Sequence, residues 1–352
     1  MAEKHSQVTG REVVQMAFEL REPPRLPVTL LAGGSWMAYS AGKSFAEMKL
    51  NPQTAANAVI RAFEQVGHDL LWVGSGYANY AIHVLGCAIK DDSSDPTSLL
   101  GTVITSLKEV KSLTIQKVKS SSIIQALVLS QRMVADSIGK KALLLSLQWG
   151  PLTCAARILG VEAAMTAMVE EPEALMTLLN LCTELIWAVT EPALEHPDIL
   201  GIAIADPFAS GDLISAQTFS VFVAPFLAEL VRRAREKGKY SMIHICGDTS
   251  TILEHLARIH PDCFSLDQKV NLTEARRALG GKVCVAGNLS PTGAILNGMP
   301  ADVTAEARDC LRAWGDGGGF ILTLGCDYPK TVPIENIMAL MSMKAERSRS
   351  HE

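Results

Sequence analysis

Three residues in this sequence have the chemistry to bind a soft metal ion. His244 and Cys246 lie two residues apart in "HICGD", at the end of an apolar run, and Cys326 lies much later in "LGCDYP". Residues two apart on a strand point to the same side, so both donors can face one ion. Two thiolates and one imidazole suit Zn²⁺, and three protein ligands with a fourth position open are typical of catalytic zinc. The residue types therefore predict a zinc site that a substrate can approach.

The cysteines also have a plainer interpretation. A histidine and a cysteine in a strand can pack in the core without binding metal. We interpret the other cysteines in that way, because they lie on apolar helical faces, inside short strands, in an apolar loop or just beyond a strand: they are Cys87, Cys154, Cys182, Cys263, Cys284 and Cys310.

Three more polar residues fall at the ends of apolar runs and are candidates for catalytic roles. Asp206 and Asp267 could ligate the ion, orient His244 through its second ring nitrogen or act on a substrate proton. Asn288 could donate a hydrogen bond to a substrate oxygen.

The elements that must position these residues are eight apolar runs alternating with amphipathic stretches. The runs are nearly continuous in apolar residues, as strands buried on both faces are. They are "PVTLLAG" ending at Gly33, "DLLWVG" at Gly74, "ALLLSLQW" at Trp149, "DILGIAIAD" at Asp206, "YSMIHIC" at Cys246, "CFSLD" at Asp267, "VCVAGN" at Asn288 and "GFILTLGC" at Cys326.

This alternation predicts an α/β protein, a (β/α)8 TIM barrel with an extra N-terminal helix capped by Thr9 and Glu12. A doubly wound sheet is disfavoured because "LAGGSW" lacks the G-x-G-x-x-G spacing. Barrel enzymes carry their chemistry at the C-terminal ends of the strands, where the candidate residues fall. We expect a single domain over 1–352, with the N-terminal helix at 9–22, an insertion near the barrel mouth at 90–140 and a frayed tail at 344–352.

Composition narrows the class of partner. The chain has 352 residues, 48% of them hydrophobic, and a formal net charge of −5 with no basic cluster. No nucleic acid or membrane partner is therefore expected, and no apolar run of signal-peptide or membrane-spanning type is evident. We expect a cytoplasmic protein whose cysteines are reduced. Trp36, Trp72, Tyr77, Tyr80 and Trp149 fall near predicted strand ends and suggest an apolar mouth, although each could equally be a core residue.

Four stretches resemble a known superfamily. They are "ADPFASGDLIS", "HICGDTSTILEHL", "FSLDQKVNLTEARRALGGKVCVAGNLSP" and "LGCDYPKTVPIENIMAL". Together they resemble the uroporphyrinogen decarboxylase superfamily, and within it the zinc-dependent corrinoid methyltransferases, which include methylcobamide:coenzyme M methyltransferases and the methyltransferases of anaerobic demethylation. The resemblance implies a TIM barrel with His244, Cys246 and Cys326 as the zinc ligands, and it suggests a homodimer.

The same comparison separates two activities of the superfamily. Its decarboxylases carry "RQAGR" after the first strand, because a polycarboxylate substrate needs guanidinium groups. This chain has "LAGGSWMAYS" there and no arginine between Arg25 and Arg61, and it has "WVGSGYANY" where the decarboxylases have an aspartate. A decarboxylase of heme biosynthesis is therefore the disfavoured alternative.

The resemblance implies transfer of a methyl group between a small O- or S-methyl compound, or a thiol acceptor, and the cobalt of a corrinoid. The chain lacks a D-x-H-x-x-G corrinoid signature, so a separate corrinoid protein should carry the cobalt. Demethylation of a small substrate such as an aryl methyl ether and methylation of coenzyme M or tetrahydrofolate both remain open. A non-enzymatic accessory factor for a corrinoid protein and a methionine-synthase-like enzyme are further alternatives, the latter disfavoured by the short chain.

Overall fold

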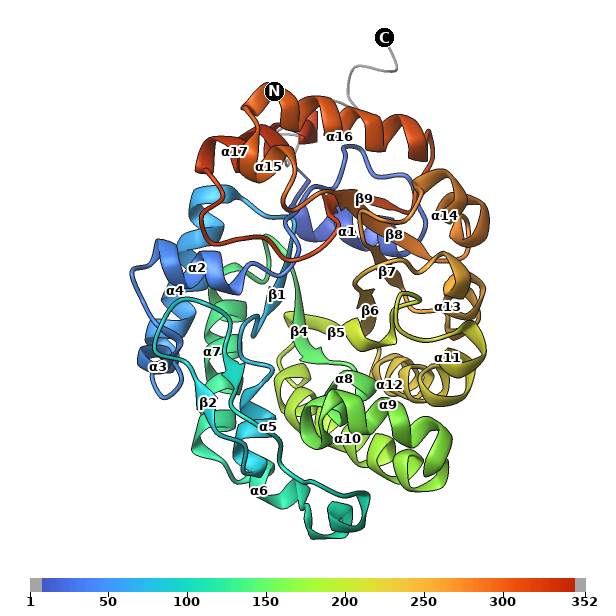
Figure 1. Cartoon of the computed structure of the whole chain (residues 1–352). Helices are drawn as coiled ribbons and strands as arrows, with labels where there is room; N and C mark the ends of the chain where they lie inside the picture. The colour runs from blue at the N-terminus through green and yellow to red at the C-terminus, as the bar shows by residue number, and fades with distance from the viewer. Residues whose placement is uncertain (1–7, 346–352) are drawn as a thin grey trace.

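The computed structural model describes residues 8–345, and their parallel strands form a ring surrounded by helices (Figure 1). Within this range a sheet of seven parallel strands has the order β1-β4-β5-β6-β7-β8-β9. These strands are β1 Leu70–Val73, β4 Leu143–Trp149, β5 Ile199–Ala205, β6 Tyr240–Ile245, β7 Cys263–Leu266, β8 Cys284–Leu289 and β9 Phe320–Leu324. A separate antiparallel pair joins β2 Ile89–Lys90 and β3 Ser98–Leu99.

A short extended segment lies between β9 and β1, the two edge strands of the sheet. Val28 forms a parallel bridge with Leu322, the Thr29 amide donates to the Leu322 carbonyl, and the Asp69 amide donates to the Val28 carbonyl. This segment takes the place of the first barrel strand. The predicted (β/α)8 barrel is thus confirmed.

The first predicted strand is nevertheless less regular than "PVTLLAG" indicated. It forms a single bridge because Pro27 has no amide hydrogen to donate. The backbone then enters the left-handed region at Ala32 (φ 57°) and Gly33 (φ 81°), which ends any extended structure.

The helices cover the outside of the ring. In chain order they are α1 Gly10–Phe18, α2 Gly34–Ser40, α3 Phe45–Met48, α4 Pro52–Val66, α5 Tyr80–Leu85, η1 Leu107–Ser112, α6 Ile115–Lys119, α7 Ser122–Ile138, α8 Pro151–Leu159, α9 Val161–Glu170, α10 Pro172–Leu194, η2 Pro207–Ala209, α11 Ala216–Phe222, α12 Ala224–Glu236, η3 Ser250–Ile252, α13 Leu253–Ile259, α14 Leu272–Leu279, α15 Ala294–Asn297, α16 Pro300–Trp314 and α17 Ile334–Ser342.

The N-terminal helix α1 begins as predicted, with a capping box between Thr9 and Glu12. Its apolar face packs with the inward-facing residues of the strands, including Val13 and Phe18 from the helix and Leu143 from β4. A larger cluster fills the layer between strands and helices. Since α1 fills the N-terminal end of the barrel, the opposite end is left for a site.

Two other predicted regions have the following structure. The stretch 90–140, expected as an insertion, holds β3, η1, α6 and α7, and α7 packs against α4. Of the expected frayed tail, residues 346–352 lie outside the described range, while Lys344 contacts Asp69 at 3.0 Å.

One helix in the described range, α10, is long and apolar enough to span a membrane. The bent pair α8 and α9 reaches that length and apolarity only if the two helices are counted as one span. Most of α10 is buried against β4, β5 and α8, and a buried core helix meets the same criterion.

Candidate metal centre

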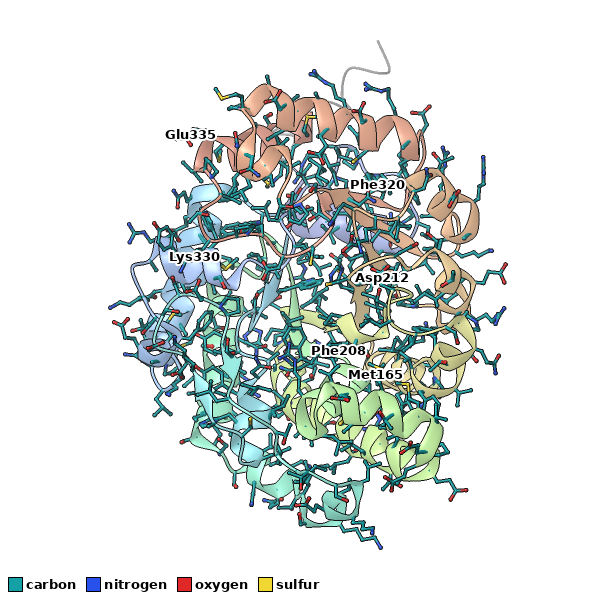
Figure 2. All side chains as sticks on the ribbon, in the orientation of Figure 1. Met165, Phe208, Asp212, Phe320, Lys330 and Glu335 are labelled. Atoms are coloured by element: carbon teal, nitrogen blue, oxygen red, sulfur yellow. The ribbon has the colours of Figure 1, made fainter. Side chains whose placement is uncertain are left out.

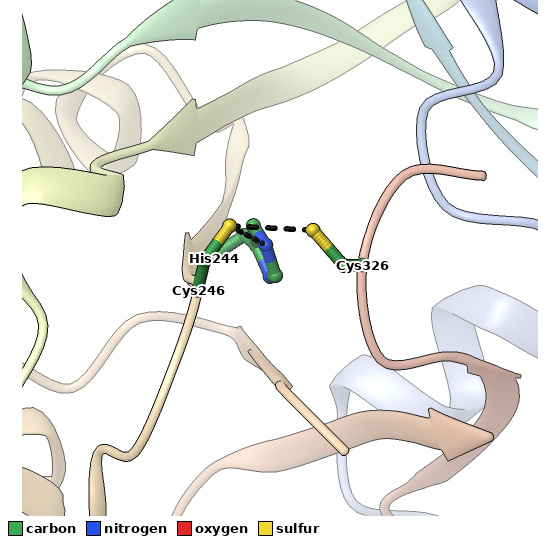
Figure 3. Close-up of side chains that lie close together, drawn as sticks. All are labelled: His244, Cys246 and Cys326. Atoms are coloured by element: carbon green, nitrogen blue, oxygen red, sulfur yellow. Dashed lines mark hydrogen bonds between the residues drawn. The ribbon is translucent and has the colours of Figure 1, made fainter. Parts of the chain in front are cut away.

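The structure brings His244, Cys246 and Cys326 together at the C-terminal end of the barrel (Figure 3). The His244 Nε2 atom lies 3.1 Å from the Cys246 sulfur, which lies 3.3 Å from the Cys326 sulfur. The three donor atoms all lie within 4.8 Å of one another, and both cysteines are free thiols. A thiol from the loop after β9 thus meets two donors from the end of β6, across two intervening strands.

This donor set fits a zinc ion. Tetrahedral zinc with Zn–S bonds of about 2.3 Å and Zn–N bonds of about 2.0 Å has ligand atoms roughly 3.5–3.8 Å apart. The separations of 3.1 Å and 3.3 Å are a few tenths of an ångström shorter, so only a small outward shift of the sulfurs is required. The soft sulfur donors favour Zn²⁺ over Mg²⁺ or Ca²⁺.

Strand geometry explains why His244 faces the cluster. Its neighbours in β6 alternate in direction, so that Met242 belongs to the barrel interior while Ile243 packs toward the helices. The imidazole Nδ1 lies 3.1 Å from the Ser265 hydroxyl and 3.3 Å from the Ser265 carbonyl. Donation from Nδ1–H to these oxygens leaves the lone pair on Nε2, the nitrogen that faces the sulfurs.

The backbone turns sharply just after Cys246. Gly247 has φ 82°, and a Cβ there would meet the Asp212 and Ser210 side chains at 2.5 Å, so glycine is required. The Gly247 amide donates to the Asp267 carboxylate at 2.8 Å. Asp267 therefore fixes the turn that presents Cys246.

The two thiols are electrostatically unequal. The pKa of Cys326 is lowered to about 4, mainly by a hydrogen bond from Cys246 and also by His244. The hydrogen bond to Cys326 and burial raise the pKa of Cys246 well above its usual value. Cys326 is therefore the easier of the two thiols to deprotonate, and a bound dication would favour loss of the proton from both.

The three residues predicted for catalysis have other contacts. Asp206 is fully buried and accepts hydrogen bonds from the Thr153 hydroxyl (2.6 Å), the Thr153 amide (2.7 Å) and the Leu152 amide (3.3 Å), which holds the first turn of α8. Burial raises the pKa of Asp206 to about 6. Asn288 donates to the carbonyls of Asp267 and Val270. These contacts are with the protein itself, and a catalytic role for these residues stays a prediction.

A cavity of about 180 Å³ lies against the metal cluster, and His244, Cys246 and Cys326 all form part of its wall. Neither Asp206, Asp267 nor Asn288 lines it. Figure 2 looks into this end of the barrel, with Phe208 and Lys330 marking segments at different points around the ring.

Asp327 lines the cavity but was not among the predicted site residues. Its carboxylate accepts from the Gly33 and Tyr328 amides at 2.9 Å and 2.8 Å, and burial raises its pKa to about 6. It joins the loop that carries Cys326 to the segment after the first barrel strand. Its position in "GCDYP", next to a candidate ligand, was the available signal.

The aromatic residues expected at the mouth divide into two groups. Trp72 and Trp149 line the cavity. Trp36, Tyr77 and Tyr80 do not, and they pack in the layer between strands and helices. The six cysteines interpreted as core residues are all buried, as expected.

Comparison with known proteins adds a family and relatives. Residues 9–346 match the family model described as uroporphyrinogen decarboxylase (URO-D). The methylcobamide:CoM methyltransferase MtaA of Methanosarcina barkeri is 26% identical over 349 residues, covering 97% of this chain and 99% of that protein. A methylated-thiol–coenzyme M methyltransferase of Methanosarcina mazei is 27% identical over 256 residues, covering 73% of this chain and 67% of that protein. The solved structure of a methyltransferase from Methanosarcina mazei has the same fold, with a TM-score of 0.84 at 21% identity over 97% of this chain and 100% of that one.

Proposed function

The chain belongs to the uroporphyrinogen decarboxylase family, and we propose that it is a zinc-dependent methyltransferase that moves a methyl group between a small O- or S-methyl compound, or a thiol acceptor, and the cobalt of a separate corrinoid protein. The relatives named as methyltransferases support the general activity. The zinc dependence and the substrate are our inference from the site.

One observation carries the proposal: His244, Cys246 and Cys326 converge on one point in the wall of an apolar cavity. His244 and the two cysteines would hold zinc, and the ion would act as a Lewis acid that stabilises negative charge on a substrate oxygen or sulfur. Ser265 orients the imidazole, and Asp267 and Asp327 fix the two segments that carry the thiols.

The reaction exchanges one bond of the methyl carbon for another. In demethylation the bond from carbon to oxygen or sulfur breaks, and its electron pair stays on the heteroatom, which then takes a proton. Reduced cobalt of the corrinoid co-substrate supplies the pair for the new cobalt–carbon bond and passes from Co(I) to Co(III). Methylation of a thiol is the reverse exchange.

Decarboxylation of a porphyrinogen fits this cavity poorly. Among the described residues that line it, none is Lys or Arg, whereas a substrate with many carboxylates needs cationic partners.

The test combines metal analysis with a spectroscopic assay. Purified protein is incubated with cob(I)alamin and methyl ethers, methyl thioethers or methyl-coenzyme M, and methylcob(III)alamin is followed by absorbance. We expect methylation with at least one donor, and none with Cys326→Ser. Bound zinc with four protein ligands and no turnover with any donor would instead indicate an accessory factor.

A further inference from the structure

The cavity beside the metal cluster restricts the charge of the substrate. Resting on the function proposed above, we infer that the substrate is a small neutral molecule with an apolar body of about one aromatic ring, carrying its methyl group on oxygen or sulfur. Anionic compounds such as coenzyme M, which carries a sulfonate, are then poor ligands of this chain, although relatives are named for coenzyme M.

The size of the cavity sets the size of the body. Its volume is about 180 Å³. An apolar cavity of roughly 150 Å³ in another protein admits benzene, so one ring with a small substituent is the expected scale. Trp72, Leu147 and Trp149 provide apolar walls from β1 and β4.

The charges of the wall disfavour an anion. None of the described residues that line the cavity is Lys or Arg, and Asp327 adds a carboxyl group. Two thiolates would balance the charge of a bound dication. Burying a sulfonate without a cationic partner is costly, because the charge loses its hydration and gains no ion pair.

A guanidinium does lie close to this wall. Arg157 stacks on the ring of Trp149, 4.5 Å from its centroid, and it does not line the cavity. It is the residue to test as a hidden anchor for an anion.

Two polar side chains of the wall, Asn79 and Ser75, are hydrogen-bonded within the protein. Asn79 donates to the Thr97 carbonyl at 2.6 Å and accepts from the Trp149 indole at 2.7 Å. The Ser75 hydroxyl accepts from the Gly34 amide at 3.0 Å. These contacts leave fewer groups to solvate a strongly polar substrate.

Trp72 is an exception to this pattern. It is 3% exposed, it lies 6.1 Å from the His244 ring between centroids, and its indole N–H has no hydrogen-bond partner among the described residues. This nitrogen is itself buried, so it offers no accessible donor to a ligand in the cavity, and the wall gives no reason to prefer an O-methyl over an S-methyl compound.

The experiment compares three ligands of similar shape. These are 4-methoxybenzenesulfonamide, which is neutral, its anionic counterpart 4-methoxybenzenesulfonate, and the neutral thioether 4-(methylthio)benzenesulfonamide. Binding to zinc-loaded protein is measured by calorimetry, and formation of methylcob(III)alamin is measured separately. We expect the neutral ether to bind at least tenfold more tightly than the anion. Equal or tighter binding of the sulfonate, or no binding of either neutral ligand, overturns the inference.

Two variants sharpen the result. Pro96 lines the cavity and is exposed, so Pro96→Lys adds a cation with little risk to the fold, and it should improve sulfonate binding relative to Pro96→Met. If wild-type protein binds the sulfonate well and Arg157→Gln abolishes that binding, Arg157 is the anchor and the inference is wrong. Selective binding of the neutral ligand without any methylcobalamin supports the inference and counts against the methyltransferase proposal alone.

Discussion

The two sides of the cavity are built in different ways. The metal side takes its donors from the ends of strands, with His244 and Cys246 at the end of β6 and Cys326 just after β9. The rest of the lining combines Trp72 and Trp149 with the segments that hold Ser75–Asn79 and Pro96–Thr97, which follow β1 and precede β3. Strand ends keep their places because the barrel is closed, whereas loop positions depend on distant contacts. The metal donors thus come from positions at or next to strand ends, whereas the rest of the lining combines two strand residues with two loop segments.

The largest expected effect is on the metal side. Cys326→Ser replaces one sulfur donor with a hydroxyl, so the variant should lose most of its bound zinc and nearly all activity while keeping its fold. Metal content by mass spectrometry and circular dichroism check this. Cys310→Ser, at a buried thiol outside the cluster, is the control and should retain zinc. An unchanged zinc content in Cys326→Ser would contradict the assignment of Cys326 as a zinc ligand.

A weaker effect is expected from the residue that orients the imidazole. Ser265→Ala removes the hydroxyl 3.1 Å from His244 Nδ1 and leaves the carbonyl contact. Loss of such a partner lowers zinc affinity about 10-fold to 100-fold in related situations, and we expect the lower end of that range. Competition with a chromogenic chelator measures it. Ser241→Ala removes a hydroxyl from β6, the strand next to β7, and serves as a control. This variant is expected to leave the zinc affinity unchanged.

Changes in the rest of the lining should affect substrate binding and not metal content. Trp149→Ala removes an aromatic wall and should raise KM about tenfold or more, the scale of a lost apolar contact in a binding pocket. Zinc content should stay the same. Trp149→Phe keeps a ring and should have a smaller effect. A Trp149→Ala variant that loses zinc would show that the two sides are not independent.

The smallest effect is expected at the rim. Lys330 and Asp95 form an ion pair at 2.6 Å between the loop after β9 and the loop before β3. The pair is partly exposed, so Lys330→Met should change the free energy of unfolding by less than about 1 kcal/mol. Urea unfolding of the two single variants and the double variant Lys330→Met/Asp95→Asn measures the coupling. A coupling free energy above about 2 kcal/mol between Lys330 and Asp95 would mean that this ion pair, and not the barrel, holds the two loops in place.

The strands could be predicted because apolar runs are a local pattern, and the cluster could be predicted because a closed barrel brings strand ends together. Seven apolar runs became regular strands, and the rule that chemistry sits at strand ends brought Cys326 to His244 and Cys246. The exception was the run at Pro27, where the missing amide hydrogen limits pairing.

The strand register and the individual long-range contacts could not be predicted from the sequence. Ser265 pairs with His244 in the register of β6 and β7, and Asp327 accepts from an amide on Gly33, nearly the whole chain away. Tyr77 and Tyr80 follow a strand end, as the mouth residues do, but a T-shaped contact of Tyr77 with Phe45 and a hydrogen bond from Tyr80 to Asp91 hold them elsewhere. Such contacts are set by tertiary packing and leave no recognisable pattern in the amino-acid sequence.

X-ray absorption at the zinc edge, on purified protein without and with a thiol ligand, tests the central claim most directly. We predict one zinc per chain with two sulfur neighbours at about 2.3 Å, one imidazole nitrogen and one light-atom ligand, and a third sulfur when thiol is added. A spectrum with no sulfur neighbours, with four sulfurs before any thiol is added, or a protein that holds no zinc would contradict the account.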